Sequence, residues 1–129
     1  QTLGINDSVS FEGYVAFGPD LLSYYRKCDV FALSSRSEGI PKTLIEAMGS
    51  ALPLVVTTVG GIPNLIEHEH TGLLTPPNQP QELANSIDRL VSSWDLRERL
   101  GEEALTVARE FTVENQSKIV CEKIIQDIH

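Results

Sequence analysis

The sequence predicts an α/β domain with an open, mostly parallel sheet of about four strands and with helices at its C-terminal end. Short apolar segments alternate with helix-like segments through residue 75, as parallel strands do when right-handed crossovers join them. The segments 30–33 and 52–58 are rich in apolar and β-branched residues, which is typical of strands covered on both faces. Beyond residue 75 the apolar residues follow a helical period.

Local signals place the elements of the first half. A first strand is expected at Val9–Gly13. A helix is expected to begin at Pro19 and to run through Lys27, because its basic end suits the helix dipole. The apolar strand at 30–33 follows. Pro41 then suits the first turn of a helix that ends near Gly49, since the missing N–H of proline has no partner at that position anyway.

The second half continues with two more strands and then with helices. The helix after Pro80 is expected to bury one apolar face, because its apolar residues recur at helical spacing. That face consists of Leu83, Ile87, Leu90 and Val91. The elements are expected in this order: a strand at 52–58, a short helix at 63–67, a short edge strand at 71–75, and helices at 80–91, at 95–109 and from a Thr112 cap onward.

Bulk properties limit the class of protein. The chain has 129 residues, enough for one domain with a real core. It has no apolar run of about 18 residues and no features of a signal peptide, so a cytoplasmic location is expected. The net charge of −8 argues against a nucleic acid as partner. With no initiator methionine and fewer strands than the usual roughly five or six, residues 1–129 are expected to form a single partial Rossmann-like domain of a longer chain.

The cysteines and histidines do not predict a metal site. Cys28 and Cys121 are far apart in sequence and each lies among apolar residues, so both are expected to be small buried side chains. His68 and His70 alternate with other polar residues before Gly72. That pattern favours a surface turn over a metal pair.

Two carboxylates flank the start of the helix at Pro41. Glu46, one turn inside, leans back towards the helix N-terminus and can accept both hydrogens of a vicinal diol such as that of ribose. Glu38, in the preceding loop, can reach a sugar hydroxyl, and Gly39 permits close approach of the backbone to a ligand. The alternative is that acidic residues near helix starts are structural, because the dipole favours them.

Backbone donors complete this predicted site. The first N–H groups of the helix, with that of Ile40 before it and those of Lys42 and Thr43 within it, are expected to lack partners and to suit a diphosphate. Lys42 and Leu44 are placed with the binding residues, although a solvated first-turn residue and a packing residue would look the same. No other nucleotide or esterase motif and no cluster of metal ligands is present.

A second glycine-bearing turn follows the strand at 52–58. Gly60-Gly61 opens the short helix at Ile62 and should lie at the same edge of the sheet, so Gly60, Gly61 and Ile62 are included in the predicted binding site. The alternative is a tight turn that requires positive φ. That alternative explains one glycine better than it explains two.

The order of these motifs resembles a known family. The chain is similar, along nearly its whole length, to the C-terminal domain of retaining GT-B glycosyltransferases, specifically glycosyltransferase family 4 (glycosyl transferases group 1). The signature of that family is a pair of glutamates eight positions apart, which Glu38 and Glu46 match here. The resemblance rests on Cys28 to Ser35, Glu38-Gly39-Ile40-Pro41, Leu44 to Met48, Pro53 to Gly61, and Gly72-Leu73-Leu74, in that order.

The resemblance implies a nucleotide-sugar site on a truncated GT-B C-terminal domain. It implies that Glu46 holds the ribose and that Glu38 meets the donor sugar as the catalytic residue. It also implies that backbone groups from Gly39 to Lys42 and near Gly60-Gly61 meet the sugar and diphosphate. The family transfers the sugar with retention and usually without a metal, so no cofactor or metal is expected. The protein would mainly support the departing nucleotide diphosphate electrostatically.

Departures from the family pattern limit this expectation. Thr58 and Asn64 stand where the family often has acidic residues, and Arg36 is expected to be a surface residue. The first strand–helix pair of the family domain and the whole N-terminal, acceptor-binding domain are absent from the sequence. This piece alone is therefore expected to be inactive, and the missing N-terminal domain is its expected partner.

The leading hypothesis is the donor-binding half of a glycosyltransferase that uses a UDP-, GDP- or ADP-sugar. A stand-alone sugar-nucleotide-binding or interaction module without transferase activity is the alternative, and an epimerase of GT-B form fits the glutamate pair less well. Association of the parent with the inner face of a membrane remains open. The first strand should lack a neighbour, which predicts dimerisation through its edge.

Overall fold

The computed structural model describes residues 3–112, 114–115 and 117. Its sheet has three parallel strands in the order β1-β2-β3, with β1 at Phe31–Leu33, β2 at Leu54–Thr57 and β3 at Leu73–Thr75. The α/β class and the parallel sheet are therefore confirmed. Parallel strands have their carboxyl ends at one common edge of the sheet, so the loops that follow β1 and β2 are neighbours, and the N–H of Gly61 in the second loop donates a hydrogen bond to the carbonyl of Gly39 in the first.

Helices surround this sheet close to their predicted positions. Along the chain, two of the described helices come before β2 and two come after β3. The four are α1 (Pro19–Lys27), α2 (Lys42–Gly49), α3 (Pro80–Ser92) and α4 (Trp94–Ala108). Three single turns of 3-10 helix are η1 (Asn6–Ser8), η2 (Ile62–Asn64) and η3 (Arg109–Phe111). Among the described helices, none is long and apolar enough to cross a membrane.

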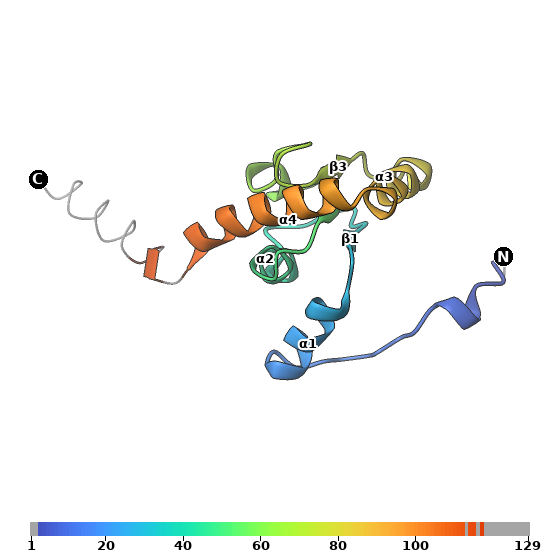
Figure 1. The fold of residues 1–129 in the computed structure, drawn as a ribbon, viewed down its shortest axis with the longest axis horizontal. Helices are drawn as coiled ribbons and strands as arrows, with labels where there is room; N and C mark the ends of the chain where they lie inside the picture. Colours follow the sequence, from blue (N-terminus) through green and yellow to red (C-terminus); the bar gives the residue numbers. More distant parts are fainter. Residues whose placement is uncertain (1–2, 113, 116, 118–129) are drawn as a thin grey trace, which may run out of the picture.

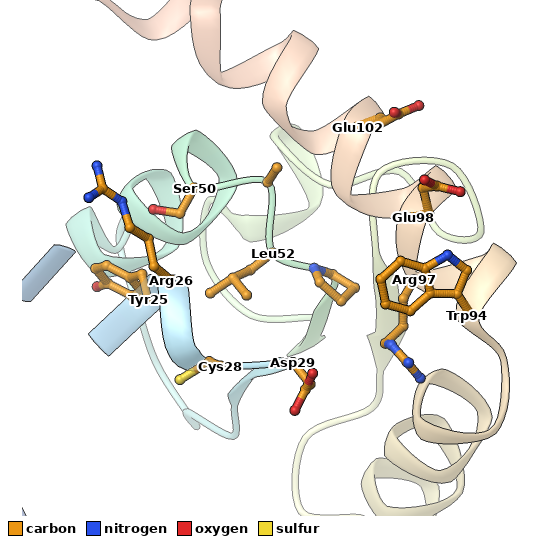
Figure 2. Close-up of a pocket in the computed structure, with 12 residues that line it drawn as sticks. Tyr25, Arg26, Cys28, Asp29, Ser50, Leu52, Trp94, Arg97, Glu98 and Glu102 are labelled. Carbon is orange, nitrogen blue, oxygen red and sulfur yellow. The ribbon is translucent and has the colours of Figure 1, made fainter. Parts of the chain in front are cut away.

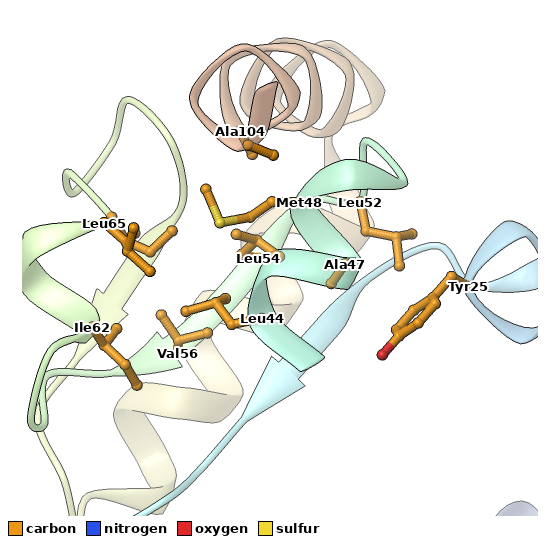
Figure 3. Close-up of a cluster of buried hydrophobic side chains, with 12 residues drawn as sticks. Tyr25, Leu44, Ala47, Met48, Leu52, Leu54, Val56, Ile62, Leu65 and Ala104 are labelled. Atoms are coloured by element: carbon orange, nitrogen blue, oxygen red, sulfur yellow. The ribbon is translucent and has the colours of Figure 1, made fainter. Parts of the chain in front are cut away.

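The strand β2 lies at the centre of the core, and all four of its residues are buried. Side chains of a strand alternate between the two faces of a sheet. Leu54 and Val56 accordingly join the cluster of α2 and α4 side chains drawn in Figure 3. Val55 joins Leu73, Leu90 and Leu100 in a second cluster, with α3 on that side. Two apolar layers therefore hold the sheet and fix where β1 and β2 end.

The strand predicted at Val9–Gly13 does not form. Phe11 is 94% exposed and Tyr14 is 93% exposed, and the segment before α1 runs apart from the sheet (Figure 1). A strand needs a neighbour to satisfy its backbone groups, and no described residue pairs with this segment. The predicted dimer depended on the unpaired edge of this strand. Because the strand does not form, the structure offers no support for that dimer.

Two predictions of burial are wrong. Val91 is 60% exposed, because the neighbouring Leu90 takes the inward position and the next residue lies about 100° further round the helix. Cys28 is exposed because it follows the last residue of α1, in the short connection to β1. Cys121 and most of the helix predicted after Thr112 lie outside the described residues. Thr112 does cap as expected, since its Oγ1 accepts a hydrogen bond from the N–H of Asn115 at 3.2 Å.

The C-terminal end of α2 packs directly against α4 at Gly101. A Cβ atom on Gly101 would lie 2.2 Å from the carbonyl oxygen of Ala51. We expect Gly101→Ala to lower the free energy of unfolding by about 1–2 kcal/mol, because the overlap with backbone outweighs the roughly 1 kcal/mol gained in helix propensity. Urea denaturation measures this loss. Gly49→Ala is the control, since a Cβ there would meet no atom within 4 Å, and an equal loss in both variants would contradict the steric explanation.

Candidate functional site

The candidate site lies where β1 and β2 end. The helix α2 begins at Lys42, with Pro41 as its N-cap at φ −66° and ψ 126°. Its first bond is donated by the N–H of Leu44 to the carbonyl of Pro41 at 3.1 Å. The predicted helix start is therefore correct to within one residue. Proline suits this position because its ring fixes φ near the value found here and because it has no N–H that would need a partner.

Unpaired backbone donors gather at this helix start. Within the described part of the chain, the N–H groups of Ile40, Lys42 and Thr43 form no hydrogen bond. The side chain of Lys42 is 77% exposed. These donors and the helix dipole give this end of α2 a partial positive charge, which suits an anionic group.

Glu46 is held by two side chains. Its Oε2 accepts a hydrogen bond from the hydroxyl of Tyr25 at 2.9 Å, and its Oε1 lies 3.9 Å from Nζ of Lys42. The Glu46 side chain is only 11% exposed. Burial, together with the neighbouring Glu46, raises the pKa of Tyr25 to about 12, so its phenol stays protonated and remains a donor. No local motif in the sequence indicates Tyr25 as a site residue, because it lies 21 residues before Glu46.

Two hydrogen bonds, both made by Ser35, connect Glu38 to the end of β2. Its Oε1 accepts a hydrogen bond from the hydroxyl of Ser35 at 2.5 Å. The carbonyl of Ser35 in turn accepts one from Oγ1 of Thr57, the last residue of β2, at 2.6 Å. No described residue donates to the other carboxylate oxygen of Glu38. One oxygen is therefore fixed, and the other is available to a ligand.

The paired glycines pack against the Glu38 loop. Gly60 has φ 53°, and a Cβ atom on it would lie 1.7 Å from the carbonyl oxygen of Glu38. The N–H of Gly61 donates to the carbonyl of Gly39 at 2.9 Å. The two motifs do meet, as predicted, but the amide of Gly61 is already used inside the protein. The helix expected at 63–67 is only the single 3-10 turn η2, so a second helix dipole does not contribute here.

The other predicted binding residues divide by exposure. Ile40 is 53% exposed, and a Cβ on Gly39 would meet no atom within 4 Å, so the loop is open to a ligand at both residues. Leu44 and Ile62, in contrast, are fully buried. Their side chains belong to the core and leave no surface for a ligand.

A hollow of about 330 Å³ lies at the same edge, between the strand ends and the start of α3. Ser34, Arg36, Thr57 and Asn78 are among its lining residues. Its lining residue Arg36 lies two positions before Glu38 in the chain, but neither Glu38 nor Glu46 lines this hollow. Because its walls come from the end of β2 and from the segments after β1 and β3, no local motif in the sequence indicated it.

A second hollow, of about 390 Å³, lies at the opposite edge of the sheet, where β1 and β2 begin. Figure 2 shows Trp94 and Arg97 of α4 on one side of it and Cys28 and Asp29 on the other. Its lining mixes both charges with apolar groups. None of the predicted site residues lines it, but Tyr25, whose hydroxyl binds Glu46, is one of its lining residues.

The histidines form a surface turn, as predicted. Nδ1 of His68 accepts a hydrogen bond from the N–H of Leu74 at 2.9 Å, and Arg89 binds both carboxylate oxygens of Glu69 in the same turn at 2.7 and 3.1 Å. That pair holds the pKa of Glu69 below its usual value. The part of the chain that the structure describes contains no group of side chains that could hold a metal ion.

A family model and a curated relative both indicate similarity to glycosyltransferases. The family model for glycosyl transferases group 1 matches residues 1–107. An uncharacterized glycosyltransferase of Methanocaldococcus jannaschii is 34% identical over 125 residues, which are 97% of this chain but 29% of that protein. The chain thus spans less than a third of the length of this curated relative.

Solved structures show the same fold. Anabaena HepE in complex with UDP-glucose has a TM-score of 0.85 and 29% identity, over 96% of this chain and 34% of HepE. The C-terminal domain of LpcC, a glycosyl transferase group 1 family protein from Francisella tularensis, has a TM-score of 0.75 and 27% identity. That comparison covers 84% of this chain and 55% of the LpcC chain.

Proposed function

This chain belongs to the glycosyl transferases group 1 family, and we propose that it forms the donor-binding part of a glycosyltransferase that moves a sugar from a nucleotide-sugar to an acceptor. The observation that carries the proposal is the start of α2, where unpaired N–H groups lie between Glu38 and Glu46. The similarity of this chain to HepE, whose structure was solved in complex with UDP-glucose, supports a nucleotide-sugar as the donor.

Each part of the site has a proposed role. Glu46 accepts hydrogen bonds from the ribose diol, because its carboxylate is held at the second turn of α2. The N–H groups at the start of α2 bind the diphosphate and stabilise its charge as it departs. Glu38 uses its available oxygen to contact the donor sugar. Gly39 and Ile40, on the open side of the loop, lie against the ligand.

Finer features of the reaction are also part of the proposal. We propose that transfer proceeds with retention and without a metal or other cofactor. The acceptor would be bound by an N-terminal domain of the parent protein, so the present domain alone would be inactive. We further propose a cytoplasmic parent enzyme. The relatives support the proposal of a further domain in the parent protein, since the matched region is only a part of each of their chains.

Substitution of Glu46 tests the proposal. In the full-length protein, Glu46→Ala is expected to weaken binding of a ribonucleoside diphosphate by about 1.5–3 kcal/mol, roughly 10- to 150-fold, which is usual for hydrogen bonds to a charged group. Calorimetric titration with UDP, GDP and ADP measures the affinity. Glu103→Ala, which removes an exposed carboxylate from α4, is the control and should bind normally.

Two outcomes would contradict the proposed function. Unchanged affinity in Glu46→Ala would remove the ribose assignment, and no binding of any of the three nucleotides by the unaltered protein would remove the donor site itself. A protein that binds a nucleotide-sugar but transfers its sugar to no acceptor would instead favour a binding module. Separating the labelled sugar products by chromatography distinguishes transfer from binding.

A further inference from the structure

Tyr25 reaches the donor site from a different element of the fold. It lies near the end of α1 and is 7% exposed, and Figure 3 shows it beside α2 with Ala47 nearby. Its ring lies 6.4 Å from that of Phe31, at 50° between the ring planes. Both the ring and the hydroxyl are therefore fixed, the ring by packing and the hydroxyl by its bond to Glu46 at 2.9 Å.

This bond fixes the orientation of the Glu46 carboxylate, whose side chain is 11% exposed. A glutamate on a helix has three rotatable bonds, and the N-terminal part of α2 is open to solvent at Lys42 and Thr43. The hydroxyl of Tyr25 holds Oε2, and Lys42 attracts Oε1 towards the start of the helix. A carboxylate has about four lone-pair sites, so one bond to Tyr25 leaves enough acceptor capacity for two ribose hydroxyls.

We propose that Tyr25 is a positioning residue that orients the Glu46 carboxylate for recognition of a ribose diol. This inference rests on the donor site proposed above. Tyr25 does not touch the nucleotide in this account and acts only through Glu46. An oriented acceptor loses less conformational freedom when the ligand binds, so the hydroxyl of Tyr25 increases affinity for nucleotides that carry the complete diol.

A purely structural role makes a different prediction. If the hydroxyl of Tyr25 only satisfied a buried group, its removal would affect all ligands alike or only the stability of the fold. If it orients Glu46, its removal should weaken binding of ribonucleotides more than binding of 2′-deoxyribonucleotides, which lack half of the diol. The ratio of the two affinities therefore separates the roles.

The experiment uses the full-length protein with Tyr25→Phe, which keeps the ring and removes the hydroxyl. The ligand is whichever of UDP, GDP and ADP binds most tightly, with its 2′-deoxy counterpart. We expect Tyr25→Phe to weaken binding of the ribonucleotide by about three- to tenfold and to weaken binding of the deoxynucleotide clearly less, because only its 3′-hydroxyl remains to contact Glu46. Calorimetry measures both affinities, and circular dichroism checks the fold.

A matched control lies next to Tyr25 in the sequence. The hydroxyl of Tyr24 also donates to a carboxylate, that of Glu12 at 2.8 Å, but this pair is exposed. Tyr24→Phe should leave both affinities unchanged. Combining Tyr25→Phe with Glu46→Ala should give no further loss beyond that of Glu46→Ala, because the positioned group is then absent.

The outcomes separate the inference from the proposed function. If Glu46→Ala weakens ribonucleotide binding but Tyr25→Phe has no effect, or has an equal effect on both ligands, the positioning role is wrong and the donor site stands. If the unaltered protein binds no nucleotide, both are wrong. Should Tyr25→Phe fail to fold, NMR of the unaltered protein with carbon-13-labelled tyrosine replaces the variant. The Tyr25 signal must then respond more strongly to the ribonucleotide than to its deoxy counterpart, and an equal response would contradict the positioning role.

Discussion

Replacing Gly60 by alanine is expected to lower the free energy of unfolding by about 2–5 kcal/mol and to displace the Glu38 loop. Gly60 has φ 53°, and an added Cβ atom would lie 1.7 Å from the carbonyl oxygen of Glu38. The left-handed backbone costs an ordinary residue roughly 1–2 kcal/mol. The overlap costs more, since it involves the backbone and no side-chain rotation relieves it. Urea unfolding measures the change.

Gly39 provides the control for this substitution. It lies in the adjoining loop, but its φ is not positive and an added Cβ atom would meet nothing within 4 Å. Gly39→Ala should therefore change stability by no more than about 0.5 kcal/mol. Equal stability of the two variants would show that the backbone contact at Gly60 is relaxed in solution, and the proposed support of Glu38 by this turn would be wrong.

Glu38→Gln is expected to lower turnover of the full-length enzyme by about 100-fold or more and to change donor affinity much less. Glutamine has nearly the same shape and keeps an oxygen that can accept from Ser35, so the loop should remain in place. In the proposed role, what it loses is negative charge next to a donor sugar that becomes electron-poor as the nucleotide departs. Steady-state transfer rates and donor binding, measured on the same preparation, give the two effects.

The comparison variant is Glu67→Gln. Glu67 is exposed and follows η2, and its hydrogen bonds with Thr71 are made by its backbone. Turnover of this variant should match that of the unaltered enzyme. If Glu38→Gln reduces turnover and donor affinity by the same factor, Glu38 contacts the donor equally in the ground state and in the transition state, and its catalytic role is contradicted.

Most of the secondary structure could be predicted from the sequence because its signals are local. The apolar run before Ser34 forms β1, the proline at position 41 marks the start of α2, and the elements after Gly72 begin and end within about two residues of their predicted limits. The segment at 9–13 shows where such signals fail. Its residues favour a strand, but strand formation also requires a partner, and the local pattern carries no information about one.

The site was predictable in part for the same reason. Glu38 and Glu46 share one loop and one helix, so their spacing indicates a common site. Tyr25 lies 21 residues before Glu46, and their contact depends on how α1 packs beside α2. The sequence allowed for the positive φ of Gly60, but the close approach of the carbonyl of Glu38, in another loop, was hidden. Contacts between elements are the information that periodicity and spacing lack.

The anchoring of the Glu38 loop has a consequence for how this domain can evolve. Its position is fixed by backbone contacts with Gly60 and Gly61 and by the Thr57–Ser35 bond, while the side chain of Ile40 projects outward and is 53% exposed. Substitutions at Ile40 can therefore alter the surface of the proposed donor site with little effect on folding. If that site binds the donor as proposed, its selectivity can change at Ile40 while the backbone contacts that support the loop stay the same.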